Sequence, residues 1–416
     1  MSDRLPAASP SPARSPARSP ARSSARATAR RAALRRPSAL LGGISPQTFM
    51  AEYWQKQPLL IRQAAPEYID RFPVDDLFEL AGDDDVESRL VTRTRGRWKL
   101  ERGPLADDVR AALPTRDWSL LVQGMNLYDD DAAALLEGFR FIPDARVDDL
   151  MISYAPDGGG VGPHFDSYDV FLLQTHGRRR WRISHQQDLS LDPRQPMKVL
   201  SHFVAEQEWI LEPGDMLYLP PHVAHEGVAL GECITCSIGF RAPSETELLA
   251  QFLQRMAERI AANEAPPVRY QDPEQDAVAR PAALPPRLIA ATRTLVDGLR
   301  WGADDVQAFL GSYLSEPKSN VYFDPPQRAM RMETFVRRAQ ARGLHLDSRT
   351  QMLYDEQRLY INGEPFEVAS LRSRKVLFGM ADERSLEPED FVTLSNDSPI
   401  VSAMFEWYLA GWIDLV

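Results

Sequence analysis

Residues 158–166 read Gly-Gly-Gly-Val-Gly-Pro-His-Phe-Asp, and residues 212–225 read Glu-Pro-Gly-Asp-Met-Leu-Tyr-Leu-Pro-Pro-His-Val-Ala-His. In the first stretch a glycine-rich turn leads to a histidine and a carboxylate two positions apart, and such positions face the same side of a β-strand. In the second stretch a Pro-Gly turn precedes a short apolar strand, and a Pro-Pro loop then presents two further histidines. Together the two stretches predict a barrel of strands that carries a metal site.

Three side chains in these stretches are the candidate metal ligands: His164, Asp166 and His225. Two imidazoles and one carboxylate leave about three coordination positions open, as non-haem Fe(II) oxygenases need for a co-substrate and dioxygen. His222 is a competing ligand, but His225 follows the loop and begins the next apolar run. The other histidines of the region are expected at the surface or in a hairpin: His176, His185 and His202.

A hairpin is expected between the two halves of the metal site, with strands over residues 168–174 and 178–183. Alternation along its second strand puts Arg179 on the same face as the apolar Trp181 and Ile183. A buried arginine is costly unless it pairs with an anion, and its planar fork suits a carboxylate. Arg179 is therefore the candidate anchor for the distal carboxylate of 2-oxoglutarate. The neighbouring arginines fit a solvated strand edge: Arg178, Arg180 and Arg182.

The chain from Asp148 to Pro243 resembles the Jumonji-C oxygenases of cupin fold. Among them it is most similar to the bacterial ribosomal oxygenases that hydroxylate an arginine of large-subunit ribosomal protein sixteen. The entry Tyr53-Trp-Gln-Lys-Gln-Pro-Leu-Leu-Ile-Arg62 also resembles that family, so the similarity runs from near Leu40 toward the C-terminus. The further matching motifs are Asp148-Asp-Leu-Met-Ile-Ser153, residues 158–171, Gly177-Arg-Arg-Arg-Trp181, Leu211-Glu-Pro-Gly-Asp215, His225-Glu-Gly227 and Ser237-Ile-Gly-Phe-Arg-Ala-Pro243.

The resemblance implies both a fold and a reaction. The fold would be α+β: a double-stranded β-helix (a cupin or Jumonji-C jelly roll), then a helical dimerisation region and a winged-helix-like C-terminal domain. The enzyme would be a 2-oxoglutarate-dependent dioxygenase, an arginine 3-hydroxylase that forms succinate and carbon dioxide as it acts. Fe(II) would be held by His164, Asp166 and His225, and dioxygen would take the remaining coordination position.

The resemblance also assigns contacts to the co-substrate and the substrate. Ser153 and Thr235 would contact 2-oxoglutarate beside Arg179, although Thr235 stands where the family pattern has an asparagine. Asp149 and Met151 share a strand face with Ser153, and that strand leads to the metal site. Asp149 would pair with the guanidinium of a substrate arginine, and the aliphatic stem of that arginine would lie between Met151 and Tyr168.

Two other functions stay open from the sequence. The same chemistry could act on a histidine of a ribosomal protein or on a methyl-lysine. A protein of a different class, a catalytically silent cupin that binds a peptide or a sugar, would keep the fold without the reaction. The metal-ligand trio together with an inward Arg179 argues against the silent cupin.

Composition fits a globular enzyme with two or three domains. The chain has 416 residues, of which 44% are hydrophobic and 26% charged. No apolar run approaches the roughly 18 residues that a membrane helix needs. Only two cysteines are present, Cys233 and Cys236, which favours a reducing compartment and hence the cytoplasm. Their spacing would put them on opposite faces of a strand, and the chain has no second cysteine pair to complete a zinc site. We therefore expect both cysteines to pack in the core.

The first 36 residues hold nine arginines and a single acid, Asp3. We expect a disordered Arg/Ser/Pro-rich tail over residues 1–38, because such a sequence has little to bury. A dispensable tail, a nucleic-acid-attracting tail, a transit peptide and an over-long translation start are all compatible with it. Without the first 36 residues the formal net charge falls from −11 to −19, and an acidic body suits a basic protein substrate.

Three further segments follow the tail: a Jumonji-C domain with its lead-in over 39–243, a helical region over 244–300 and a winged-helix-like domain over 301–416. The helical region opens with an apolar stripe from Leu248 to Ile260, and the resemblance implies that it forms a homodimer. The last segment is acidic and shows no basic stripe, so no direct DNA binding is expected. Helices are expected at 46–55, 74–80, 131–138, 287–300, 304–314, 334–342, 371–380 and 400–409, a strand at 118–122, a linker at 264–286 and a hairpin at 352–361.

Overall fold

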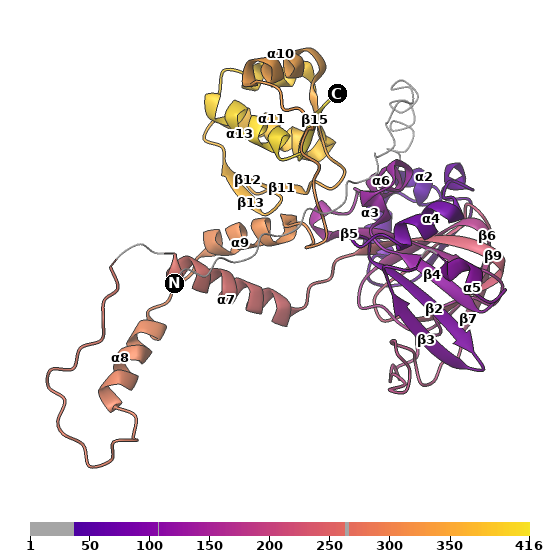
Figure 1. Cartoon of the computed structure of the whole chain (residues 1–416), viewed down its shortest axis with the longest axis horizontal. Coiled ribbons are helices and arrows are strands. Elements are labelled where there is room, and N and C mark those ends of the chain that lie inside the picture. Colours follow the sequence, from indigo (N-terminus) through magenta and orange to yellow (C-terminus); the bar gives the residue numbers. More distant parts are fainter. Residues whose placement is uncertain (1–36, 107, 263–265) are drawn as a thin grey trace, which may run out of the picture.

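The computed structural model describes residues 37–106, 108–262 and 266–416. The arginine-rich tail expected over residues 1–38 therefore lies almost entirely outside the described residues. The chain forms a barrel domain, a central pair of helices, a projecting helix and a C-terminal domain (Figure 1). Among the helices described, none is both long enough and apolar enough to cross a membrane.

One nine-stranded sheet builds the barrel domain, in the order β1-β8-β6-β9-β5-β4-β2-β3, with β7 also paired to β6. Its centre is an antiparallel pair of long strands, β6 (Val170–Ser184) and β9 (Ala224–Phe240). The other strands are β1 (Leu59–Ile61), β2 (Ser88–Thr94), β3 (Arg97–Arg102), β4 (Trp118–Val122), β5 (Val147–Ala155), β7 (Gln207–Leu211) and β8 (Met216–Leu219).

Both faces of β6 are buried over its first six residues, 170–175. On the outer face Phe171 and Tyr218 pack against Phe49 of α3, with ring centroids 5.5 and 5.0 Å apart. On the inner face Leu172 and Leu217 form the barrel core. Burial on both sides explains why the sequence of β6 begins as a continuous apolar run. The helices of this domain are α2 (Pro37–Leu40), α3 (Pro46–Glu52), α4 (Val74–Ala81), α5 (Val109–Ala112) and α6 (Asp130–Glu137).

The hairpin expected over residues 168–183 is wrong, because residues 170–184 form the single strand β6. Its pairing with β9 shifts register beside Gly177, which has a φ of 59°. A Cβ at Gly177 would lie 1.8 Å from the carbonyl oxygen of Glu232, so this glycine marks a bulge pressed against β9. The predicted alternation nevertheless holds, since Arg178 is exposed and Arg179 is buried.

Helix α7 (Glu245–Ala261) follows the barrel and packs against α9 (Ala303–Ser315). Only part of its apolar stripe is used there: Phe252 and Met256 are buried, whereas Leu249 is 61% exposed. The described linker residues 266–285 contain no helix or strand. Helix α8 (Pro286–Asp297) then stands away from the rest of the chain in Figure 1 and buries none of its residues.

The C-terminal domain combines helices with two small sheets. The expected hairpin is present as β11 and β12, and β13 extends it after the Asn362-Gly363 turn. The sequence prediction missed one short helix, α12. The elements are α10 (Met332–Arg342), α11 (Leu371–Glu383), α12 (Pro388–Leu394), α13 (Ser398–Leu409), β10 (Leu344–Leu346), β11 (Met352–Tyr354), β12 (Arg358–Ile361), β13 (Glu364–Glu367), β14 (Ser385–Leu386) and β15 (Ile413–Leu415).

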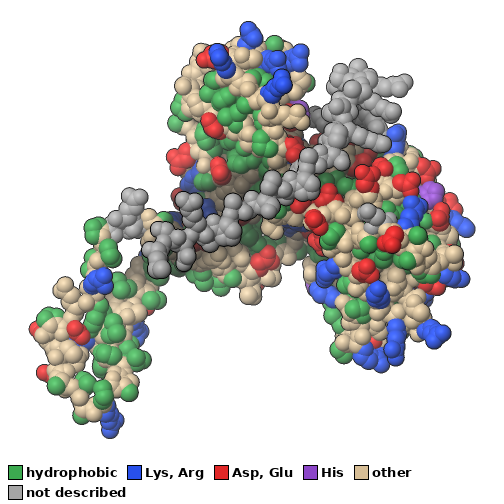
Figure 2. Space-filling model, viewed as in Figure 1, with side chains coloured by type: hydrophobic (Ala, Val, Ile, Leu, Met, Phe, Trp, Pro, Cys, Tyr) green, Lys and Arg blue, Asp and Glu red, His purple; other side chains and the backbone are tan. Residues whose placement is uncertain are grey.

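One helix of this domain departs from the expected absence of a basic stripe. Arg337, Arg338 and Arg342 of α10 are all exposed. Figure 2 shows Lys and Arg side chains gathered at the end of the domain where α10 lies in Figure 1. The basic residues are therefore concentrated locally within a chain whose formal net charge is −11.

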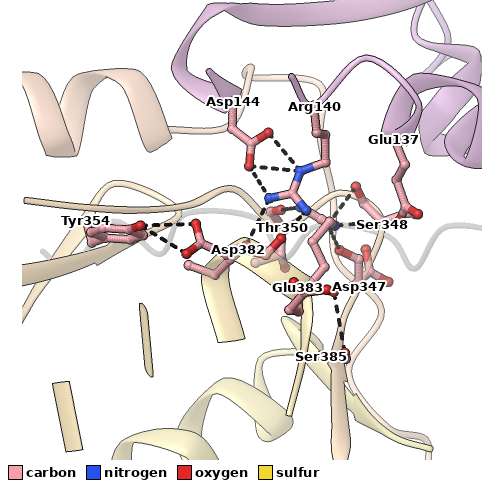
Figure 3. Close-up of polar contacts among 12 residues, drawn as sticks. Glu137, Arg140, Asp144, Asp347, Ser348, Thr350, Tyr354, Asp382, Glu383 and Ser385 are labelled. Atoms are coloured by element: carbon pink, nitrogen blue, oxygen red, sulfur yellow. Dashed lines mark hydrogen bonds and ion pairs between the residues drawn. The ribbon is translucent and has the colours of Figure 1, made fainter. Parts of the chain in front are cut away.

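An arginine of the barrel domain fastens the C-terminal domain in place (Figure 3). Arg140 donates to the carbonyl oxygens of Ala381, at 3.0 Å, and Asp382, and it pairs with Asp144 at 2.6 Å. The last carbonyls of a helix lack partners within the helix, and Arg140 supplies them for α11. Arg384 of the C-terminal domain lies 4.0 Å from Glu137 of α6. Each domain thus contributes an arginine to the contact between them.

Candidate active site

An isolated backbone bridge brings the two histidines of the candidate trio together. The N–H of His164 donates to the oxygen of His225 at 2.9 Å, and the reverse bond measures 2.7 Å. The imidazole centroids are consequently 4.2 Å apart. His225 Nε2 lies 3.7 Å from Asp166 Oδ2, and one ligand atom from each of the three residues lies within 4.8 Å of the others. The structure therefore gathers the three candidate ligands into one cluster.

Backbone carbonyls orient both imidazoles. His164 Nδ1 lies 2.9 Å from the oxygen of Gly162, and His225 Nδ1 lies 2.9 Å from that of Val223. A carbonyl oxygen can only accept, so each Nδ1 carries the proton and each Nε2 offers its lone pair to the cluster. Burial, together with the neighbouring His164, lowers the pKa of His225 to about 4. His225 is thus neutral at pH 7, the state in which an imidazole binds a metal.

His222 lies outside the cluster and contributes through its backbone. Its N–H donates to the carbonyl oxygen of Asp166 at 2.7 Å, and its ring stacks on Phe165 with centroids 5.8 Å apart. It therefore positions the chain around Asp166. The other histidines of the region lie at the surface as expected: His176 beside Asp70, His185 beside Glu206, and His202.

Two glycines allow close packing on β9 beside the cluster. A Cβ at Gly160 would lie 2.4 Å from the oxygen of Gly227, so the glycine-rich turn runs directly against the strand. A Cβ at Gly227 would lie 2.7 Å from the Trp181 indole, which occupies that space instead. These contacts hold the segment that carries His164 against the strand that carries His225.

Arg179 is buried inside the barrel without a partner. Its exposed fraction is 6%, and within the described part of the chain neither Nε nor Nη2 has a hydrogen-bond partner. The guanidinium lies 5.8 Å from the ring centroid of Trp181, and that ring lies 5.9 Å from the His225 ring. A buried cation with free donors is costly unless an anion binds it. The position fits a small dicarboxylate that reaches from Arg179 toward the histidine cluster.

Ser153 and Thr235 sit side by side on paired strands, deep in the barrel. Thr235 Oγ1 donates to Gln174 Oε1 at 2.9 Å, and Gln174 in turn donates to the oxygen of His176 at 2.6 Å. Ser153 Oγ lies 3.4 Å from the carbonyl oxygen of Thr235. The sequence analysis missed Gln174, which fixes the orientation of the Thr235 hydroxyl.

Asp149 and Tyr168 lie close to each other, because a Cβ at Gly239 would be 3.7 Å from the Tyr168 ring and 3.9 Å from Asp149 Oδ1. Asp149 is 6% exposed and accepts hydrogen bonds from Gly124 N at 3.1 Å and Gln123 Nε2 at 3.2 Å. Burial raises the pKa of the Asp149 carboxyl. Tyr168 is 39% exposed, and its pKa is raised first by burial and then by the charges of Asp166 and Asp149.

Two further side chains lie near Asp149, of which the sequence analysis predicted only Met151. Met151, expected beside the substrate, has its sulfur 3.6 Å from Arg89 Nη2. Lys318, which follows α9, was not expected here. Its Nζ lies 2.8 Å from Asp148 Oδ1 and 3.9 Å from Asp149 Oδ2. No local pattern in the sequence could signal a contact between residues so far apart.

Comparisons with known proteins account for most of the chain. A JmjC domain matches residues 134–248, and a ROXA-like winged helix matches residues 298–414. The chain is 36% identical over 280 residues to the ribosomal protein uL16 3-hydroxylase of Escherichia coli, covering 67% of this chain and 74% of that relative. It is 31% identical over 398 residues to a probable ribosomal oxygenase of Haemophilus influenzae, covering 89% and 96%. The chain belongs to the ribosomal oxygenase family.

Solved structures of ribosomal oxygenases share the whole architecture. An X-ray structure of Escherichia coli YcfD has a TM-score of 0.77 at 31% identity and covers 90% of this chain and 98% of its own. A YcfD structure in complex with cobalt and 2-oxoglutarate has a TM-score of 0.74 at 30% identity and covers 89% and 98%. The predicted family, fold class and enzyme class, a 2-oxoglutarate-dependent dioxygenase, are confirmed.

Proposed function

We propose that this ribosomal oxygenase uses Fe(II), 2-oxoglutarate and dioxygen to hydroxylate an arginine side chain of ribosomal protein uL16. The observation that carries the proposal is the unpartnered, buried guanidinium of Arg179 in the same barrel as the His164, Asp166 and His225 cluster. A two-histidine, one-carboxylate donor set suits Fe(II) with open positions, and the guanidinium suits a carboxylate. A ribosomal protein substrate supports a cytoplasmic location.

Each residue of the site has a separate task. His164, Asp166 and His225 hold the metal, and Fe(II) bound there supplies the oxidative chemistry. Arg179 holds the distal carboxylate of 2-oxoglutarate, while Ser153 and Thr235 border the co-substrate deeper in the barrel. The chain's own contribution is to position the reactants and to exclude water from the barrel interior.

Asp149 is the residue that selects the substrate. Its carboxylate is buried, accepts hydrogen bonds from Gly124 and Gln123, and lies beside the Tyr168 ring. A guanidinium can pair with it through two parallel hydrogen bonds, and its aliphatic stem can lie against Tyr168 and Met151. This arrangement favours arginine over the ribosomal histidine that stays the alternative target, and the β-carbon of the arginine is the carbon directed at the metal.

The Asp149→Asn variant is expected to raise the KM for a uL16 peptide by about tenfold or more, because it removes a charge-assisted hydrogen bond of about 1.5–3 kcal/mol. The KM for 2-oxoglutarate should stay unchanged. Peptide-dependent succinate formation measures both constants. A peptide with lysine in place of the target arginine should also react poorly, since lysine lacks the planar fork.

A matched control is Asp157→Asn, which removes a surface carboxylate that is 53% exposed. It should behave like the wild type. Equal KM values for the arginine peptide in the Asp149→Asn variant and the wild type would remove Asp149 from substrate recognition.

The same enzyme is proposed to act as a homodimer through α8. The helix has no buried residue, and an apolar groove of about 470 Å³ runs along it. Leu288 is 38%, Ile289 52% and Val296 59% exposed, and a second copy of the chain would cover them. The Ile289→Glu variant is expected to sediment as a monomer in analytical ultracentrifugation. Leu371→Glu, at a 77% exposed position of α11, should keep the wild-type mass, and a dimer in both variants would refute the α8 interface.

A further inference from the structure

A groove of about 410 Å³ opens where the barrel domain meets α9. Its walls are aromatic and its rim is acidic. Tyr168 and Phe240 come from the barrel, and Tyr313 comes from α9. The carboxylates that line it are Asp148, Glu247 and Glu316. Tyr168 also lies beside Asp149, because a Cβ at Gly239 would be 3.7 Å from the Tyr168 ring and 3.9 Å from Asp149 Oδ1, so the groove adjoins the proposed substrate side of the active site.

Two adjacent carboxylates of β5, Asp148 and Asp149, lie in different surroundings. The pairing of β5 with β9 shifts register here, between Val147 and Leu150. Asp148 lines the groove, whereas Asp149 is buried and accepts hydrogen bonds from Gln123 and Gly124. The side chains of Asp148 and Asp149 are 32% and 8% exposed, respectively. Lys318 bridges them, with its Nζ 2.8 Å from Asp148 and 3.9 Å from Asp149. One internal ammonium group thus lies beside both carboxylates.

The second cation of the groove has a structural task. Arg241 Nη1 donates to the carbonyl oxygen of Leu314 at 3.2 Å, and its Nε lies 3.8 Å from Asp148. Arg241 therefore ties the barrel to α9. Lys318, by contrast, makes no hydrogen bond to the backbone of the described residues, and its side chain is 42% exposed. A flexible, strongly hydrated lysine in a partly exposed pair can leave its carboxylate at small cost.

We propose that this groove is a second cation subsite, which binds a basic side chain flanking the target arginine in the ribosomal protein. Lys318 occupies Asp148 until that side chain displaces it. Aromatic walls pack the aliphatic stem and attract the cationic end, and the acidic rim supplies counter-charges. The proposal rests on the proposed function, because the target arginine at Asp149 fixes which residues of the peptide reach the groove.

Two peptides test the subsite. The first carries the target arginine with lysine at the flanking positions, and the second keeps the arginine but has glutamine at each of those positions. The wild type should show a higher KM for the second peptide. Glu316→Gln should raise the KM for the first peptide by up to about fivefold, the effect of one partly exposed charge pair, and leave the second unchanged.

The direction in which the Lys318→Met variant changes the KM for the basic peptide is the decisive observation. Removing the internal competitor should lower the KM for the basic peptide more than the KM for the glutamine peptide, because Lys318 Nζ lies 2.8 Å from Asp148 but 3.9 Å from Asp149. The KM for 2-oxoglutarate should stay unchanged. Lys99→Met is the matched control, because Lys99 pairs with Glu101 on β3 and should change nothing. A higher KM for both peptides in Lys318→Met, or equal KM values of the wild type for the two peptides, would overturn the subsite. Failure of the wild type to hydroxylate either peptide would overturn the proposed function instead.

Discussion

Replacing Asp166 by alanine is expected to lower peptide-dependent 2-oxoglutarate turnover by more than about 100-fold. Loss of a residue that only hydrogen-bonds to a metal ligand already costs up to about 100-fold in metal affinity or activity, and Asp166 is a proposed ligand itself. Asp166 is the only carboxylate in the cluster that the described residues form around His164 and His225. The barrel itself should stay folded, because Asp166 belongs to neither of the two hydrophobic clusters that form its core. Succinate release measures turnover, and the thermal melting temperature reports the fold.

His222→Ala is the control for that variant. His222 contacts Asp166 only through its backbone N–H, which alanine keeps. The variant should therefore retain most of the activity. Near-normal turnover in Asp166→Ala, or a loss in His222→Ala as large as in Asp166→Ala, would show that the ligand assignment is wrong.

Replacing Arg179 by alanine is expected to raise the KM for 2-oxoglutarate by roughly 30-fold or more. Truncating one partner of a buried charge pair costs about 2–5 kcal/mol, and each 1.4 kcal/mol corresponds to a factor of ten. The position suits so large an effect because Arg179 is buried and its Nε and Nη2 have no partner among the described residues. The measurement is the dependence of turnover on 2-oxoglutarate concentration at saturating peptide.

Arg178→Ala tests whether the effect belongs to one side of the strand. Arg178 is the exposed neighbour on β6, so its removal should leave the KM for 2-oxoglutarate near the wild-type value. If the two variants raised the KM for 2-oxoglutarate equally, the buried, inward position of Arg179 would not explain the effect of its removal.

Local sequence patterns predicted the residues of the site whose geometry is local. A spacing of two put His164 and Asp166 on one side of the chain, and alternation with Trp181 placed Arg179 inside the barrel. The hairpin failed for a physical reason. Gly177 is compatible with a turn or with a bulge, and only its distance from Glu232 on β9 decides between them.

Contacts across long stretches of sequence could not be predicted. Arg140 donates to the end of α11, 241 residues away at Ala381, and nothing near Arg140 in the sequence marks that role. Lys318 likewise reaches Asp149 only because α9 lies beside the barrel. The stripe of α7 was recognised, but the sequence could not tell that Phe252 is buried while Leu249 is exposed. Packing between distant elements makes these distinctions.

The most direct test of the central claim is tandem mass spectrometry of a uL16 peptide after incubation with the purified protein, Fe(II), 2-oxoglutarate and oxygen. The expected product carries one added oxygen on the β-carbon of an arginine, formed in equal amount to succinate, and it should be absent with the Asp166→Ala variant. An added oxygen on a histidine, or an unmodified peptide from a protein that has bound iron and 2-oxoglutarate, would contradict the account.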